Sequence, residues 1–159
     1  MEIEGIGAHG KVVKAFHIKE RNYFALKYVT LLEDISTEDE LMKNIEEAQL
    51  MELLNTLKSP NIISLFDHGY TQEVSCNLIK YLYVIKMEYA SCTLKEILDE
   101  RQKQKLFYNK FHAFYIFEMI LSGLIAAKSL GITHRDIKDA NILIHINEKN
   151  QDINYKIAD

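Results

Sequence analysis

The sequence predicts an α+β fold in which a strand-rich first half precedes a mainly helical second half. Two observations support this prediction. Runs of β-branched and aromatic residues occupy much of the chain up to Tyr89, whereas long apolar segments with helical character follow it. Pro60 is the only proline, and no repeat or low-complexity tract divides the chain. We therefore expect two subregions that meet near residues 88–91.

The first half is expected to form a sheet with one main helix. The expected elements are strands at 11–16 and 23–29, a helix from 36–40 to 57, and strands at 62–66 and 81–89. The polar turn 19–22 between the first two strands is typical of a hairpin. Leucines recur at helical spacing between residues 50 and 57, and Pro60 ends the helix. The strand at 81–89 is mostly apolar, so we place it in the interior of the sheet.

The second half is expected to contain two helices and a further hairpin. These elements lie at 94–100, at 111–130, and at 141–146 with 154–157. The long helix is apolar nearly all round and ends at Gly131. Its most apolar stretch, 113–127, is short for a bilayer and contains Glu118, which favours a buried helix over a membrane span.

Composition narrows the class of protein. The chain has 159 residues, of which 48% are apolar and 26% charged, as in ordinary globular domains. Its net charge of −4 offers no basic footprint, so we expect no nucleic-acid partner. Cys76 and Cys92 suit neither a disulfide framework nor a zinc site. With no secretory signal at the start, these features predict a soluble cytoplasmic protein without membrane association.

Two short motifs in the first half have residue types that contact phosphates. Gly5, Gly7 and Gly10 form a G-x-G-x-x-G-x-V pattern, in which glycines let the backbone approach phosphate oxygens. A strand rather than a helix is expected next, which argues against a dinucleotide-binding unit and leaves a plain glycine-rich hairpin tip as the alternative. Lys27 lies inside an apolar strand, where an ammonium needs an anionic partner if it is buried. The strand pattern by itself favours an outward-facing lysine.

The most informative motif is Thr-His-Arg-Asp-Ile-Lys-Asp-Ala-Asn at residues 133–141. Asp136 and Asn141 are five positions apart, with Lys138 between them, and apolar segments lie on either side. A solvated loop would explain the charge but not this order of residue types. Asp159 follows the short strand at 154–157, an arrangement that is common by itself.

These motifs together resemble the eukaryotic protein kinase domain of the serine/threonine type. The glycine loop, the strand lysine in Phe-Ala-Leu-Lys at 24–27, the H-R-D-x-x-x-x-N loop and the aspartate of D-F-G occur in the family's order. The resemblance spans the whole chain. It implies a kinase-like fold with a β-rich small lobe at 1–89 and the first part of a helical large lobe at 90–159.

The resemblance also implies ligands and residue roles. ATP and Mg²⁺ would bind, and the substrate would be a protein with a serine or threonine hydroxyl. Asp136 would orient that hydroxyl and accept its proton, Lys138 would stabilise the transferred phosphoryl group, and Lys27 would contact the α- and β-phosphates. Asn141 and Asp159 would hold magnesium. The other implied nucleotide contacts are Gly5, Gly7, Gly10, Val12, Ala25, Met87 as gatekeeper, Glu88 and Ala90 in the hinge, and Leu143.

The helix glutamate that pairs with the strand lysine is less easily placed. At the family's distance before the Pro-Asn pair this chain has Leu50, while Glu46 and Glu47 lie about one turn earlier. Both glutamates share a face with apolar residues, which suggests a cationic partner. We choose Glu47, with two solvated carboxylates as the alternative.

Two hypotheses about function follow from the point where the resemblance ends. The sequence stops at Asp159, before the Phe-Gly, activation segment and A-P-E motif of the family. In the first hypothesis the chain is a fragment of an active kinase, and by itself transfers little or no phosphate. In the second it is a catalytically inactive, kinase-like module that binds a nucleotide or a partner. In both, apolar surface of the helix at 111–130 would be left exposed.

Overall fold

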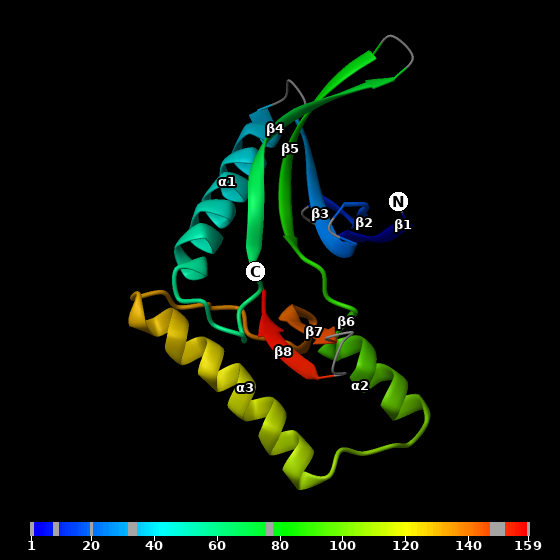
Figure 1. Ribbon diagram of the computed structural model, residues 1–159, viewed down its shortest axis with the longest axis vertical. Coiled ribbons are helices and arrows are strands. Elements are labelled where there is room, and N and C mark those ends of the chain that lie inside the picture. Colours follow the sequence, from blue (N-terminus) through cyan, green and yellow to red (C-terminus); the bar gives the residue numbers. More distant parts are fainter. Residues whose placement is uncertain are drawn as a thin grey trace. The chain divides into compact units, whose positions relative to one another are not determined.

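The computed structural model of the chain describes residues 2–7, 10–19, 21–31, 35–75, 78–146 and 152–158. The chain divides into two compact units (Figure 1), which we call unit 1 and unit 2. Unit 1 comprises Met1–Leu53 and Ser64–Tyr89, and unit 2 comprises Leu54–Ile63 and Ala90–Asp159. One boundary between the units lies between Tyr89 and Ala90. Segment 54–63 belongs to unit 2, in which Ile63 N–H donates to the Ile157 carbonyl at 3.0 Å.

Unit 1 contains an antiparallel five-stranded sheet and one long helix. The sheet order is β1-β2-β3-β5-β4. The elements are β1 (Glu2–Gly7), β2 (Gly10–His17), β3 (Asn22–Leu31), α1 (Ile35–Asn55), β4 (Leu65–Ser75) and β5 (Leu78–Glu88). The predicted hairpin, the helix and the interior position of the apolar strand β5 are confirmed. The strand predicted at 62–66 is wrong in extent, because β4 begins at Leu65 and continues through polar residues that carry no apolar alternation.

One face of the sheet of unit 1 carries the helix. Cross-strand pairs share a face, and Lys27 pairs with Ile85, which in turn pairs with His68 on β4. Tyr83 lies two positions before Ile85 on that face, and both are almost fully buried at 2% and 0% exposure. On α1, Ala48 is fully buried. The long helix is thus held by an apolar centre with polar contacts around it.

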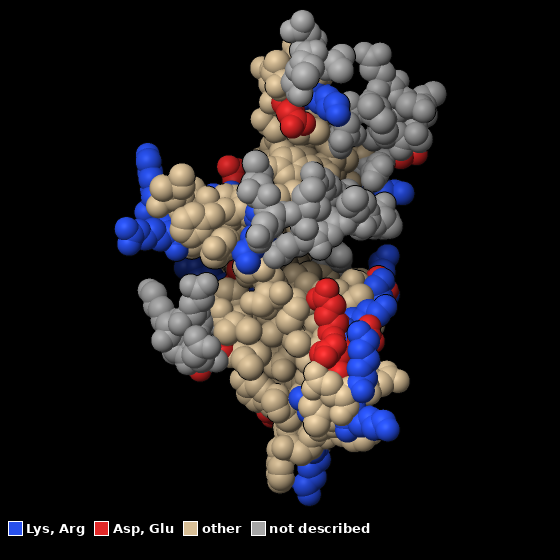
Figure 2. Space-filling view, turned by 90° about the vertical axis from the view of Figure 1, so that its right-hand side faces the viewer, with Lys and Arg blue, Asp and Glu red and all other residues tan. Residues whose placement is uncertain are grey.

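Unit 2 combines two helices with a small sheet. Its elements are β6 (Cys92–Thr93), α2 (Leu94–Lys103), α3 (Lys110–Ser129), the 3-10 turn η1 (Asp139–Asn141), β7 (Ile142–Ile146) and β8 (Ile153–Ile157). The predicted helices and the β7–β8 hairpin are confirmed. The core of the unit consists of Leu94, Ile116, Ile142, Ile144, Tyr155 and Ile157. A capping box formed by Thr93 and Glu96 marks the start of α2. Figure 2 shows basic and acidic side chains next to each other on the surface of unit 2.

The helix α3 is exposed to an extent that corrects one prediction. Among the described residues only Ile116, Gly123 and Ala127 of this helix are buried. A row of apolar side chains is instead 41–74% exposed in the chain as described, namely Phe111, Phe114, Phe117, Leu121 and Ile125. The expectation of a buried helix is therefore wrong, and the expected exposed apolar surface is confirmed. By length and composition alone α3 is also able to cross a membrane, a test that core helices pass as well.

Candidate active site

The glycine motif lies at the β1–β2 hairpin of unit 1. Gly5 pairs with Val12 and Gly7 pairs with Gly10, so two of the glycines face each other across the end of the hairpin. A strand, β2, follows the motif, which confirms that this is not the strand-to-helix turn of a dinucleotide-binding unit. The two residues between Gly7 and Gly10 lie outside the described residues. The arrangement is open to both sequence interpretations, the phosphate-covering loop and the plain hairpin tip.

Lys27 faces α1 and forms an ion pair there. Its Nζ donates to Glu47 Oε2 at 2.6 Å, and the two side chains are 10% and 25% exposed. Glu47 is the carboxylate chosen from the sequence, whereas Leu50, at the family's usual distance, is 41% exposed. Removing one partner of so buried a pair would leave an uncompensated charge, which is strongly destabilising. The outward-facing lysine is therefore excluded, and the catalytic role of the pair stays a prediction.

The register of the sheet sets several predicted nucleotide contacts on one face of unit 1. Val12 is paired with Lys27, and Ala25, two residues before Lys27, is paired with Met87. These four side chains consequently share the face on which Glu47 meets Lys27. These four side chains combine small and apolar groups with the Lys27 ammonium, and Lys14, which pairs with Ala25, lies on the same face. Their contact with a nucleotide stays a prediction.

The remaining predicted contacts lie at the end of β5 and in unit 2. Glu88 exchanges two hydrogen bonds with the backbone of Ser64, through its own N–H at 2.8 Å and its Oε2 at 3.2 Å. Its carboxylate is thus used within unit 1, and only its carbonyl would serve as a hinge contact. Ala90 is the first residue of the second segment of unit 2. Leu143 is half-buried on β7, between the core residues Ile142 and Ile144.

In unit 2 the structure brings Asp136, Lys138 and Asn141 together. Lys138 Nζ donates to Asp136 Oδ2 at 2.6 Å. Asn141 Nδ2 donates to the same Oδ2 at 3.1 Å and to the Asp136 carbonyl at 3.0 Å. The hydrogen bond from Lys138 is the main cause that lowers the pKa of Asp136, with a further contribution from Asn141. Asp136 is therefore an exposed, ionised carboxylate with a fixed orientation, which suits a group that holds a hydroxyl and receives its proton.

His134 holds this loop against the end of β8. Its Nε2 lies 3.1 Å from the Ala158 carbonyl, so Nε2 carries the proton and donates. Its Nδ1 then accepts from the Asp136 backbone N–H at 3.4 Å. Ala158 N–H in turn donates to the Asn141 carbonyl at 3.0 Å, which closes a ring of contacts around the loop. His134 thus has a structural role, through a partner, Ala158, that no local motif indicates.

Arg135 adopts a backbone conformation that arginine rarely uses. Its φ of 69° lies in the left-handed region, where a residue with a Cβ is disfavoured. Strain of this kind persists only when surrounding contacts hold it in place, and here the contacts of His134 and Asp136 lie on both sides. The sharp turn presents the Asp136 side chain outward.

Asn141 has the chemistry of a magnesium ligand. Its Nδ2 is committed to two oxygens, so the amide orientation is fixed and Oδ1 points away from them. Among the described residues Oδ1 accepts no hydrogen bond, although the residue is only 7% exposed. A free amide oxygen beside carboxylate oxygens is a donor set that Mg²⁺ prefers. The second predicted ligand, Asp159, lies outside the described residues.

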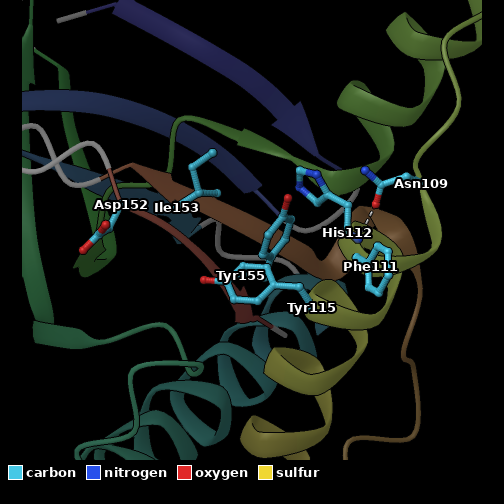
Figure 3. Close-up of a pocket in the computed structure, with 7 residues that line it drawn as sticks. All are labelled: Asn109, Phe111, His112, Tyr115, Asp152, Ile153 and Tyr155. Carbon is cyan, nitrogen blue, oxygen red and sulfur yellow. Dashed lines mark hydrogen bonds between the residues drawn. The ribbon is translucent and has the colours of Figure 1, made fainter.

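A separate pocket in unit 2 lies between α3 and β8 (Figure 3). It has a volume of about 480 Å³ and is lined by Asn109, Phe111, His112, Tyr115, Asp152, Ile153 and Tyr155. The rings of Tyr115 and Tyr155 meet edge-on with centroids 6.4 Å apart. Burial, followed by the neighbouring Tyr108, raises the pKa of Tyr155 to about 12. None of the predicted site residues lines this pocket.

Comparison with known proteins identifies the family of the chain. The family model described as "Protein kinase domain" matches residues 1–159. The chain therefore belongs to the protein kinase domain family, and its α+β architecture with an N-terminal antiparallel sheet agrees with that fold.

Curated relatives carry kinase names. Serine/threonine-protein kinase STK11 of Rattus norvegicus is 29% identical over 92% of this chain and 31% of its own length. Serine/threonine-protein kinase pakG of Dictyostelium discoideum is 32% identical over 99% of this chain and 11% of its own length. Serine/threonine-protein kinase PSK1 of Saccharomyces cerevisiae is 28% identical over 88% of this chain and 10% of its own length. The chain thus spans about a third of the first relative and about a tenth of the other two.

Proposed function

We propose that this chain is the ATP-binding and catalytic-loop portion of a protein serine/threonine kinase. The observation that carries the proposal is the arrangement of Asp136, Lys138 and Asn141, in which one ionised carboxylate is oriented by an ammonium and an amide. The Lys27–Glu47 ion pair supports it, because a buried lysine held by a partly buried carboxylate presents a fixed positive charge to phosphates. The serine/threonine type is supported by the names of the relatives and by Lys138 two residues after Asp136.

The proposed reaction moves the γ-phosphoryl group of ATP to a serine or threonine hydroxyl of a protein. The hydroxyl oxygen forms a bond to the γ-phosphorus, the bond between that phosphorus and the β–γ bridging oxygen breaks, and ADP leaves. Asp136 orients the hydroxyl and takes its proton, while Lys138 stabilises the negative charge on the transferred group. Lys27 holds the α- and β-phosphates. Asn141 and Asp159 would hold Mg²⁺, which when bound neutralises phosphate charge.

The test is phosphate transfer from Mg-ATP to a generic protein substrate, measured in the longer kinase of which we propose this chain to be a portion, as the wild type and as two variants. Asp136→Asn keeps the shape of the side chain but cannot accept the proton, so we expect transfer to fall by about 100-fold or more. Asp139→Asn is the matched control, because Asp139 lies in the same loop without a hydrogen bond to Asp136 among those described, and it should retain wild-type transfer.

Two results would contradict parts of the proposal. Equal loss in both variants would show that Asp136 has no special role. Absence of transfer by the wild type of that longer protein, together with nucleotide binding that Lys27→Met weakens, would contradict catalysis and support the inactive, nucleotide-binding module.

A further inference from the structure

A group of polar side chains in unit 1 lies outside the motifs used so far. His68 on β4 contacts two other elements at once: its Nε2 lies 3.3 Å from Glu52 Oε1 of α1, and its Nδ1 lies 2.6 Å from the Tyr83 hydroxyl of β5. Tyr83 is 2% exposed, and the side chains of His68 and Glu52 are 20% and 61% exposed. The group therefore extends from the buried face of the sheet to the solvent side of the helix.

A bulge in β4 turns His68 toward the helix. The register with β5 shifts between Leu65 and Asp67, so that His68 pairs with Ile85. Without the extra residue His68 would pair with Val84 and point to the opposite face, because a slip of one residue reverses every side chain. The bulge thus aligns His68, Ile85 and Lys27 in one row across three neighbouring strands.

This row gives α1 two polar attachment points on the sheet. Glu47 binds Lys27 on β3, and Glu52 contacts His68 on β4. Five helical residues span about 7.5 Å along the axis, and two strand spacings span about 9.5 Å across the sheet. The two contacts therefore hold the helix at well-separated places, and together they oppose both sliding and rotation of α1.

The protonation state of Tyr83 agrees with its contact with His68. The pKa of Tyr83 is raised by burial first, and then by Tyr70, Glu52 and Glu47. Tyr83 therefore stays protonated, and its hydroxyl lies within hydrogen-bonding distance of His68 Nδ1, while Nε2 of the same ring faces the Glu52 carboxylate. His68 thus links the Tyr83 hydroxyl on β5 to the Glu52 carboxylate on α1. The backbone N–H of His68 is held separately, by Asp67 Oδ1 at 2.9 Å.

We propose that His68, through Glu52 and Tyr83, is a positioning residue that holds α1 in the placement that brings Glu47 to Lys27. The role of His68 in catalysis rests on the proposed function, whereas its effect on the placement of α1 does not. His68 contacts neither Lys27 nor Glu47 directly. Loss of its contacts loosens α1 and lowers the fraction of molecules in which Lys27 is correctly held for a nucleotide.

The first test is amide hydrogen exchange along α1 without any nucleotide. Glu52→Gln removes the negative charge, and Tyr83→Phe removes only the hydroxyl, so both keep side-chain volume. We expect exchange at residues 44–54 to be about three- to tenfold faster in each, the size expected for one partly exposed ion pair or one hydrogen bond. Glu46→Gln is the matched control, since Glu46 is an exposed carboxylate on the same helix, and it should exchange as the wild type does. Unchanged exchange in both test variants would overturn the proposal.

The second test is the affinity for Mg-ATP, measured with a non-hydrolysable analogue. Glu52→Gln should weaken binding about three- to tenfold, but should add nothing when Lys27 has already been changed to Met, because both act through one ion pair. Additive losses in the double variant would show a merely structural role and overturn the proposal. If the wild type binds no nucleotide, the proposed function fails, and the exchange experiment alone decides the role of His68.

Discussion

The packing of α3 at Gly123 against Asn61 and Ile157 offers a test of the fold. A Cβ built at Gly123 would lie 2.7 Å from the Asn61 carbonyl oxygen and 2.9 Å from Ile157 Cδ1. The Asn61 carbonyl cannot move freely, because it accepts the Ile157 N–H at 2.9 Å, and the Asn61 amide donates to the Tyr155 carbonyl at 3.0 Å. Gly123→Ala therefore requires α3 to separate from the segment that anchors β8.

The expected magnitude follows from three contributions. Overpacking of this kind costs about 1–3 kcal/mol. Weakening the Asn61–Ile157 hydrogen bond costs about 1 kcal/mol more, and alanine regains about 1 kcal/mol of helix propensity relative to glycine. We thus expect Gly123→Ala to lower the free energy of unfolding by about 1–3 kcal/mol.

Urea denaturation followed by circular dichroism measures this difference. Gly69→Ala is the control, because a Cβ at Gly69 on β4 meets no atom within 4 Å, and it should cost less than about 0.5 kcal/mol. If Gly123→Ala is as stable as the wild type or more stable, helix propensity alone governs the position. The packing of α3 on Asn61 and Ile157 would then be refuted.

Further predictions concern single groups of unit 2. Lys138→Met removes the hydrogen bond that lowers the pKa of Asp136, so the carboxyl pKa should rise toward its ordinary value in a ¹³C NMR titration; an unchanged pKa would contradict the contact. Because the folded-state pKa is lowered, the stabilisation from this contact is present above the unfolded-state pKa and is lost as the pH falls through the folded-state pKa. Thr93→Ala removes the N-cap of α2 and should cost about 1 kcal/mol in urea denaturation, whereas Thr93→Ser should not. Tyr155 should ionise only near pH 12 in an ultraviolet titration, and ionisation near pH 10 would show that its hydroxyl is solvated.

Much of the fold could be predicted because local patterns were clear. The hairpin of β2 and β3 and the ends of α3 are marked by turn residues and by Gly131, whose φ is 77°. The long strand β4 was not predicted in full because its outer part is an exposed edge, where residues such as Gln72 and Glu73 show no apolar alternation. A sequence pattern reports burial on one face, and an edge strand with both faces exposed gives no such signal.

In the candidate site, too, the contacts within one short segment could be predicted from the sequence, whereas those between separate elements could not. The order of Asp136, Lys138 and Asn141 is readable in the sequence because the three residues lie in one short loop. The partner of Lys27 could be narrowed to Glu46 or Glu47 by helical spacing, but the contact itself depends on how α1 lies on the sheet. The bulge before His68 reverses the face of the sheet on which each later side chain of β4 lies, and no residue type in that segment predicts the bulge.

The most direct test of the central claim is calorimetric titration of Mg-ATP into the wild type and two lysine variants. Lys27 is buried and bound to Glu47, whereas Lys86 lies on the neighbouring strand β5 and on the other face of the sheet, since it pairs with Leu26. We expect one binding site in the wild type, affinity about 10- to 100-fold weaker in Lys27→Met, and wild-type affinity in Lys86→Met. Equal affinity in Lys27→Met and the wild type, or no binding by the wild type, would contradict the account.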